Sequence, residues 1–270
     1  MHHLPHTNTK LPGYGNHHPY WLIPFSSKVE QQVLERASPV FSTNTVQKLI
    51  CIVGLQDKLG KNVCEALGGE PNTYYFHCDV SIEDDVRRAV DFTVDKFGTL
   101  DIMVNNAGLG GSPYPDIRNA DLSDFEKVFE VNVKGVFLGM KHAARVMIPL
   151  KKGSIVSLCS VAGVMGGIGT HAYTGSKHAV LGLTRNVAAE LGKYGIRTCK
   201  LCFSLSSSNK HAYGSMHEDG KTEDAYVGFR SFFGRNSNLQ GVELSVDYVS
   251  NAVLFLASDE AEYVSADNLM

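Results

Sequence analysis

LDIMVNNAG, residues 100–108, holds the main clue to the architecture of this chain. Its first five residues form a short apolar run that predicts a buried β-strand, and the run ends at once in small and polar residues. Apolar residues recur at helical spacing before it, across 86–97, and again after it, across about 121–147. The segment is therefore predicted to be one strand of a repeating strand and helix pattern.

The same alternation covers most of the chain from about residue 48. Further strands are predicted at 49–53, 73–78, 154–160 and 196–203, and further helices at 58–67, 171–191 and 246–257. Strands separated by such helices pair in parallel through right-handed crossovers. The predicted fold class is thus α/β, a three-layer, Rossmann-like, doubly wound parallel sheet covered on both faces. Such sheets bind their ligands at the carboxyl ends of the strands.

Residues 1–46 differ from the rest of the chain. They contain five histidines within the first 18 positions, several prolines and no sustained period. We expect an irregular segment over 1–46, followed by a Rossmann-like domain over 47–270, which is the usual size of one large domain. The histidines have no carboxylate or cysteine partners at ligand spacing, so no metal site is predicted.

Composition excludes several classes of function. The 25 basic and 28 acidic residues give a net charge of −3 without a long run of one sign, so neither nucleic acid nor a membrane is an expected partner. No apolar run reaches the roughly 18 residues that a membrane span needs. No secretory or transit pattern is found at the N-terminus, so we expect a cytoplasmic protein. Cys199 and Cys202 are separated by two residues but have no second such pair, so all six cysteines are expected to be reduced and mostly buried.

Tyr173 and Lys177 lie four residues apart in a predicted helix, so their side chains leave the same face about one turn apart. A phenol in water ionises only near pH 10. An ammonium group about 4–5 Å away favours the phenolate by up to roughly 4 kcal/mol at an effective dielectric near 20. The pair is therefore a candidate general acid or base, although this spacing also occurs in exposed helices without any catalytic role.

Further polar positions accompany this pair. Ser160 ends a predicted strand 13 residues before Tyr173, the sequence NNAG follows an earlier strand at 105–108, and Asn132 lies in VNVKG between them. Together with the full motif YTGSK, this set resembles the short-chain dehydrogenase/reductase family. The surrounding segments are most similar to a plant branch of that family, the secoisolariciresinol, xanthoxin and momilactone-type dehydrogenases.

The resemblance covers residues 49 to about 197, continues from about 225, and implies a reaction. The family transfers a hydride between a nicotinamide cofactor and an alcohol or ketone, and this branch implies NAD, with NADP left open, and a hydrophobic secondary alcohol or ketone. It implies four catalytic residues. Tyr173 would exchange a proton with the substrate oxygen, Ser160 would hydrogen-bond the same oxygen, Lys177 would assist Tyr173 and hold the nicotinamide ribose, and Asn132 would anchor a water in a proton relay.

The resemblance also implies a cofactor groove and an assembly. Asp79 and Val80 would meet the adenine, and Asn105, Ala107 and Gly108 would line the groove, with Tyr173 and Lys177 at its nicotinamide end. The family commonly assembles through two long helices, which are those predicted here at 121–147 and 171–191. A homodimer or homotetramer is the implied state.

The chain departs from the family at the start of the fold. The family begins with a strand, a TGxxxGxG loop and a helix whose N-terminus receives the pyrophosphate, and this unit is not intact here. LICIVGLQDKLG (49–60) aligns either with that opening unit, with Lys58 in place of the middle glycine, or with the second strand and helix, with Gly54 in place of the ribose-binding acid. The second alignment is favoured because LQDKLG matches the branch and Asp79 then keeps its distance to NNAG. Either alignment leaves one βα unit missing before Asp79.

Two further departures bear on activity. The Pro-Gly turn that the family places beside the nicotinamide carboxamide is replaced by Phe203 and Ser204. The chain also ends in SADNLM, with Ala266 where the family has glycine and without a recognisable final strand. These departures leave a second hypothesis open: a catalytically inactive, truncated family member that acts at most by associating with its relatives.

Overall fold

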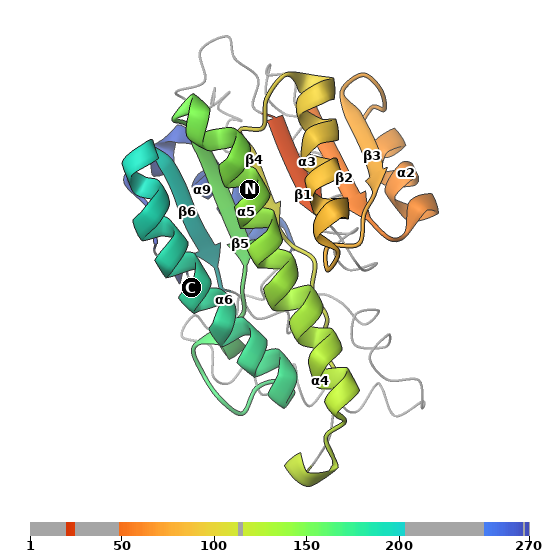
Figure 1. Ribbon diagram of the computed structural model, residues 1–270, viewed down its shortest axis with the longest axis vertical. Coiled ribbons are helices and arrows are strands. Elements are labelled where there is room, and N and C mark those ends of the chain that lie inside the picture. The colour runs from red at the N-terminus through yellow and green to blue at the C-terminus, as the bar shows by residue number, and fades with distance from the viewer. Residues whose placement is uncertain (1–19, 25–48, 113–115, 203–245, 267, 270) are drawn as a thin grey trace, which may run out of the picture.

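The computed structural model describes residues 20–24, 49–112, 116–202, 246–266 and 268–269. They form one seven-stranded parallel sheet with the order β3-β2-β1-β4-β5-β6-β7 (Figure 1). The strands are β1 (Tyr20–Pro24), β2 (Leu49–Gly54), β3 (Thr73–His77), β4 (Ile102–Asn105), β5 (Gly153–Leu158), β6 (Ile196–Leu201) and β7 (Asn268–Leu269). The strand order reverses between β1 and β4, and doubly wound sheets bind ligands at the carboxyl side of such a switch point.

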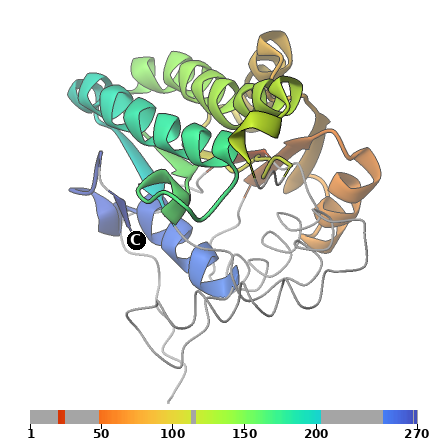
Figure 2. The same cartoon turned by 90° about the horizontal axis from the view of Figure 1, so that it is seen from below.

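Helices cover both faces of the sheet, and Figure 2 shows the three layers. One face carries α3 (Glu83–Phe97), α5 (Val136–Leu150) and α6 (His171–Leu191), and the other carries α2 (Asp57–Ala66) and α9 (Val246–Ala257). Short turns complete the described chain: η1 (Ile117–Asn119), η2 (Glu130–Gly135), η3 (Val161–Gly163), η4 (Gly192–Tyr194) and η5 (Asp259–Ala261), with α4 (Leu122–Phe129) before η2. The predicted three-layer, doubly wound α/β fold is confirmed.

Strands of this sheet are apolar on both sides because both faces are covered. In β2, Ile50 and Ile52 pack in the layer that includes α2 and α9, whereas Cys51 and Val53 pack in the layer that includes α3, α5 and α6. This explains why the strands appear in the sequence as continuous apolar runs rather than as an alternation of apolar and polar residues.

The structure corrects the expectation that residues 1–46 are irregular. β1 lies at the centre of the sheet, where Tyr20 pairs with Leu49 of β2 and Trp21 pairs with Ile102 of β4. Leu22 is 1% exposed and packs with the α3 and α5 layer. The strand of the apparently missing βα unit is therefore present, and 49–54 is the second strand of the fold, as the favoured alignment requires. The remaining residues of 1–46 lie outside the described part of the chain.

A second correction concerns the C-terminus. Asn268 and Leu269 form the short strand β7, which pairs in parallel with Lys200 and Leu201 of β6. The position of the final strand is therefore occupied. Ala266, just before it, has φ of 61°, in the left-handed region that glycine adopts without strain. This conformation explains why a glycine suits that position better than alanine.

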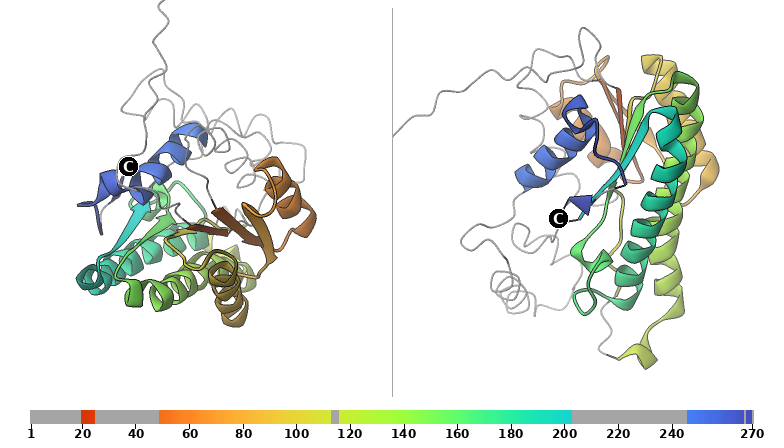
Figure 3. Two further views of the ribbon diagram at one scale, coloured as in Figure 1. Left: turned by 90° about the horizontal axis from the view of Figure 1, so that it is seen from above. Right: turned by 90° about the vertical axis from the view of Figure 1, so that its left-hand side faces the viewer.

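The long helix predicted over 121–147 is present but is not a single α-helix. α4 runs into the π-helical turn η2, which widens the helix by one residue per turn, and α5 then continues to Leu150. Such π turns are found frequently at functional sites. α4 extends past the carboxyl edge of the sheet (Figure 3). Among the described residues, no helix combines the length and the apolar character that crossing a bilayer requires.

Candidate active site

The predicted catalytic residues gather at the carboxyl edge of the sheet, on the side covered by α5 and α6. Ser160 follows β5, Tyr173 and Lys177 belong to the first turns of α6, and Asn132 belongs to η2. The N-terminal end of α6 and α4 both lie beyond this edge in Figure 1. Residues that are far apart in sequence are thus brought to the end of the sheet where ligands bind.

Asn132 is fully buried, and both the nitrogen and the oxygen of its side-chain amide form hydrogen bonds. Its Nδ2 donates to the carbonyl of Leu109 at 2.9 Å and to the hydroxyl of Ser176 at 3.0 Å, and its Oδ1 accepts from the N–H of Leu109 at 2.7 Å. The Ser176 hydroxyl in turn donates to the carbonyl of Tyr173 at 2.8 Å. Asn132 therefore ties the segment after NNAG to the first turn of α6.

Lys177 carries an ammonium group into this cluster. The residue is 5% exposed, and its Nζ donates to the carbonyl of Leu158 at 2.9 Å. The same Nζ lies 5.5 Å from the centre of the Tyr173 ring. The structure therefore places the cation beside the phenol, as the four-residue spacing predicted.

Ser160 and Tyr173 lie on two elements that pack together. The Ser160 hydroxyl accepts a hydrogen bond from the Ala162 N–H at 3.2 Å and so begins η3, which packs against α6. A Cβ placed on Gly169 would lie 3.0 Å from the Tyr173 ring and 3.8 Å from Ala162. The Tyr173 ring is thus adjacent to the turn that Ser160 begins.

The predicted groove residues after β4 lie next to this cluster. Asn105 is buried, and its Nδ2 donates to the Ser157 hydroxyl of β5 at 3.2 Å. Any Cβ on Gly139 of α5 would collide with the Asn105 side chain, so this glycine allows the helix to approach. Ala107 is buried, and a Cβ on Gly108 would lie 3.7 Å from the Lys177 Nζ.

Asp79 and Val80 lie at the other side of the same edge, after β3. The Asp79 carboxylate accepts from the Ser81 N–H at 2.9 Å and from the Ser81 hydroxyl at 2.7 Å. Val80 packs on Gly135, where a Cβ would come 3.0 Å from its Cγ2. Val80 thereby contacts the π turn η2 that also carries Asn132, although β3 is at the far edge of the sheet from β6 and β7.

Two features suit a nicotinamide cofactor at this edge. Gly108 presents no side chain beside the Lys177 ammonium. The neighbouring Asn106 is 8% exposed, and its buried Nδ2 has no hydrogen-bond partner among the described residues, so a polar ligand there would satisfy it. The pyrophosphate end of such a groove would follow β1, where residues 25–48 contain no glycine and lie outside the described part of the chain.

An acidic group that sequence reasoning passed over lies at the end of β2. The Asp57 carboxylate accepts from the Tyr75 hydroxyl at 2.9 Å and contacts His77 Nδ1 at 2.6 Å, and the Tyr75 hydroxyl also donates to the carbonyl of Gly54 at 2.6 Å. Hydrogen bonding from His77, followed by that from Tyr75, holds the pKa of Asp57 below its ordinary value. A fixed carboxylate therefore lies three residues after Gly54.

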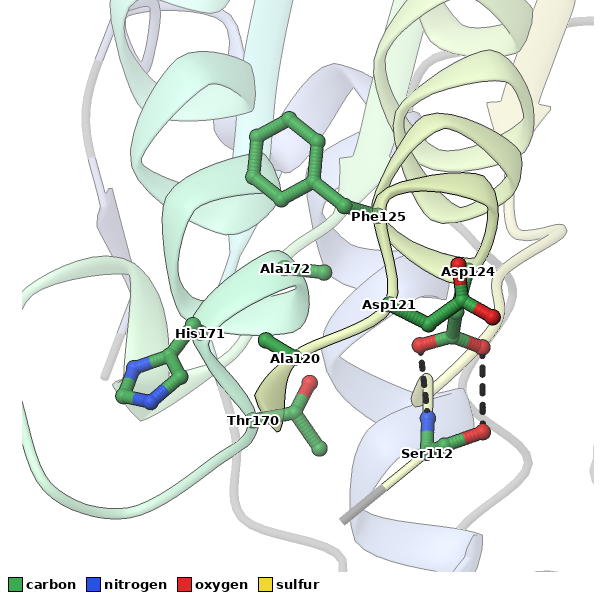
Figure 4. Close-up of a pocket in the computed structure, with 8 residues that line it drawn as sticks. All are labelled: Ser112, Ala120, Asp121, Asp124, Phe125, Thr170, His171 and Ala172. Carbon is green, nitrogen blue, oxygen red and sulfur yellow. Dashed lines mark hydrogen bonds between the residues drawn. The ribbon is translucent and has the colours of Figure 1, made fainter. Parts of the chain in front are cut away.

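A small hollow lies beside the start of α6 (Figure 4). Asp124 of α4 accepts from the Ser112 N–H at 2.9 Å and from the Ser112 hydroxyl at 3.1 Å, while the Thr170 hydroxyl donates to the Gly110 carbonyl at 2.7 Å. His171 lines the opposite wall. These bonds fix the segment after Gly108 against the helices that carry Tyr173 and Asn132.

Sequence reasoning missed Ser176 and the π turn at Asn132. Ser176 had a usable signal, because it precedes Lys177 in YTGSK and lies three residues after Tyr173, within reach of its carbonyl. The π turn had none, because its apolar spacing differs little from that of an α-helix. Phe203 and Ser204, in place of the family's turn, lie outside the described residues.

The sequence of this chain is similar to those of known proteins. Residues 48–270 match a family model described as enoyl-(acyl carrier protein) reductase. (+)-Borneol dehydrogenase 2 of Salvia officinalis is 63% identical over 222 residues, which cover 82% of this chain and 78% of that protein. Xanthoxin dehydrogenase of Arabidopsis thaliana is also 63% identical, over 225 residues, with the same two coverages of 82% and 78%.

The fold has a counterpart among solved structures. NAD+-bound xylitol dehydrogenase superposes with a TM-score of 0.77 at 23% identity, covering 92% of this chain and 96% of that one. The likeness covers most of the chain, so the doubly wound architecture described above is one found among solved structures.

Proposed function

The chain belongs to the short-chain dehydrogenase/reductase family and is therefore an NAD(P)-dependent oxidoreductase, and we propose that its reaction is catalysed by Tyr173, Lys177, Ser160 and Asn132. The substrate is a hydrophobic secondary alcohol or the corresponding ketone. The observation that supports these roles best is the buried Lys177 ammonium beside the Tyr173 ring, in one cluster with Asn132. When bound, the nicotinamide ring accepts or donates the hydride.

The side chains of the cluster move and hold the proton. In the oxidative direction Tyr173 acts as the general base and takes the proton of the substrate hydroxyl, and in the reductive direction it returns that proton. The Lys177 ammonium lies 5.5 Å from the centre of the Tyr173 ring and would also hold the nicotinamide ribose. Ser160 donates a hydrogen bond to the same substrate oxygen, and such a fixed donor stabilises charge that develops there.

The substrate class is inferred from the segment after Ser160. Val164 and Met165, which follow η3 four and five residues after Ser160, are 38% and 59% exposed, so two apolar side chains face solvent in this segment. A hydrophobic substrate would cover them. The names of the two relatives point to terpenoid compounds, and we therefore infer a terpenoid secondary alcohol or ketone.

NAD is the proposed cofactor rather than NADP. In doubly wound folds an acidic side chain near this edge accepts hydrogen bonds from the ribose hydroxyls of NAD, and it would repel the additional 2′-phosphate of NADP. Gly54 cannot do this, but Asp57 supplies a carboxylate at the end of β2. Asp79, with Val80 as the proposed adenine contact, adds a second negative charge to the same side of the edge.

A binding titration tests the cofactor assignment without relying on turnover. We expect NADH to bind the full chain more tightly than NADPH, by about tenfold or more, because one unfavourable charge contact of about 1.4 kcal/mol already has that effect. Asp57→Asn should reduce the difference in affinity between NADH and NADPH. Asp91→Asn, which removes an acidic side chain from α3, should leave that difference unchanged. Failure of NADH and NADPH alike to raise the melting temperature at millimolar concentration would favour the inactive alternative, which the comparisons do not support.

Self-association is proposed from the exposed apolar residues of α4 and α5. Leu122, Phe125 and Phe137 are 68%, 40% and 45% exposed, although each is a large apolar side chain. A second copy of the chain would remove them from water. α4 and α5 together form the first of the two long helices through which the family commonly assembles, and α6 is the second, so we infer a homodimer or homotetramer.

Light scattering tests this assembly. We expect a mass of at least two chains for the wild-type protein, and dissociation of Phe137→Glu, because a carboxylate at a buried apolar contact is costly. Arg118→Glu, a charged change at an already exposed position, serves as the control and should not dissociate. A monomer at all accessible concentrations would contradict the proposal.

A further inference from the structure

Two cysteine side chains lie side by side at the carboxyl ends of β5 and β6. Leu158 and Leu201 are the last register pair of the two strands, and the N–H of Cys159 donates to the carbonyl of Leu201 at 2.8 Å. Cys159 and Cys202 are each one residue further along, and each is 2% exposed. Both side chains belong to the same core layer, which includes α3, α5 and α6.

The separation of the two strands suits a covalent link. Neighbouring strands lie about 4.8 Å apart, and a disulfide spans Cα separations of about 4.4 to 6.8 Å. The surroundings also keep the Cys159 sulfur in place. It contacts the Lys177 carbonyl at 3.4 Å, and a Cβ on Gly163 would come within 2.7 Å of it, so only glycine leaves this space to the sulfur.

The electrostatic surroundings favour the Cys159 thiolate. The hydrogen bond from Cys202 comes first, and the charges of Lys177 and Lys200 and the Ser160 N–H add to it, so the pKa of Cys159 falls to about 6 in spite of burial. Lys200 is itself fully buried on β6, two residues before Cys202. By contrast, burial raises the pKa of Cys51 to about 12. Because the thiolate is the reactive form, Cys159 is expected to react more readily than Cys51, although both thiols are buried.

We propose that Cys159 and Cys202 form a reversible dithiol and disulfide pair beside Ser160, oxidised by peroxide and reduced by thiols. The Cys159 thiolate attacks one peroxide oxygen and the O–O bond breaks, which gives a sulfenic acid and hydroxide; the hydroxide becomes water by taking up the proton that the thiol released on ionising. The Cys202 thiol then attacks the sulfenic sulfur, an S–S bond forms and a second water leaves. Two thiols and one hydrogen peroxide thus yield one disulfide and two waters, and a thiol reductant reverses the oxidation by exchange.

The disulfide would alter the catalytic cluster through its effect on the position of Ser160. Ionised Cys159 accepts a hydrogen bond from the Ser160 N–H and feels the Lys177 charge. Disulfide formation neutralises the sulfur and ties it to β6, which removes both interactions from the residue that precedes Ser160. We expect oxidation to lower turnover by on the order of tenfold to a hundredfold, an effect that rests on the proposed function.

Peptide mapping of the full chain tests the pairing independently of turnover. The reduced protein is treated with hydrogen peroxide, its remaining thiols are alkylated, and the cysteine peptides are identified by mass spectrometry. We expect a Cys159 to Cys202 link that dithiothreitol reverses, while Cys51, Cys64, Cys78 and Cys199 remain alkylated as thiols. Recovery of Cys159 and Cys202 as separate thiols, or links formed at random among the six cysteines, would overturn the proposal.

Two variants separate the roles of the cysteines. In Cys202→Ser the second step cannot occur, so a dimedone probe should trap Cys159 as the sulfenic acid. Cys51→Ser is the matched control, because it also removes a buried thiol but should keep the disulfide. Absence of dimedone labelling at Cys159 in folded Cys202→Ser would count against the mechanism, whereas a mapped disulfide in a chain without turnover would refute only the proposed function.

Discussion

Replacement of Tyr173 with phenylalanine is expected to lower turnover by about 10²- to 10⁴-fold, the usual contribution of a positioned acid or base. The substitution removes the hydroxyl and leaves the ring, which lies beside Gly169, in place. The backbone of Tyr173 keeps its bonds to Thr170 and Ser176, so the helix start should be unchanged. Steady-state kinetics with NAD and a hydrophobic secondary alcohol measure the loss.

The control for this substitution is Tyr194→Phe. Tyr194 is a partly buried tyrosine on η4, at the opposite end of α6 from the catalytic cluster. It should retain wild-type turnover, and both variants should retain the wild-type melting temperature and affinity for NADH. Turnover of Tyr173→Phe within a factor of two of the wild type would remove Tyr173 from the reaction.

Leu22→Ala is expected to lower the free energy of unfolding by about 2–5 kcal/mol, the usual cost of truncating a leucine in a packed core. The reason is its place in β1: the residue is 1% exposed and packs with the layer formed by α3 and α5. Urea denaturation followed by circular dichroism measures the change.

Leu55→Ala serves as the control for β1. Leu55 directly follows β2 and is 53% exposed, so its truncation should change the free energy of unfolding by no more than about 0.5 kcal/mol. Equal effects of the two substitutions would mean that β1 does not occupy the centre of the sheet. A large effect of Leu22→Ala alone would confirm that the N-terminal segment completes the fold.

Local patterns were sufficient for most of the fold. The apolar runs and helical stripes from residue 49 to 202 predicted β2 through β6 and their helices, because each of these elements buries a face that its own sequence displays. The strand β1 was not predicted because prolines stand at both of its ends and no glycine loop follows it. Its identity depends on partners, since Leu49 and Ile102 on the two neighbouring strands pair with it from both sides.

The candidate site, like the fold, was predictable from local sequence only in part. Tyr173 and Lys177 were predictable because helical spacing alone brings them together, and the family resemblance supplied Ser160 and Asn132. The hydrogen bonds of Asn132 with Leu109 and Ser176 join segments that no local spacing relates. The neighbouring positions of Cys159 and Cys202 likewise follow from the register of β5 and β6, which a single strand does not reveal.

The central claim is that the Tyr173 and Ser160 hydroxyls act on one substrate oxygen beside a nicotinamide ring. A crystal structure of the full chain with NADH and a non-reacting hydrophobic alcohol tests it most directly. We predict that both hydroxyl oxygens lie within about 3.2 Å of the alcohol oxygen, with the Lys177 ammonium at the nicotinamide ribose. A bound alcohol that only one of the two hydroxyls reaches, or NADH held away from the carboxyl edge of β4 and β5, would contradict the account.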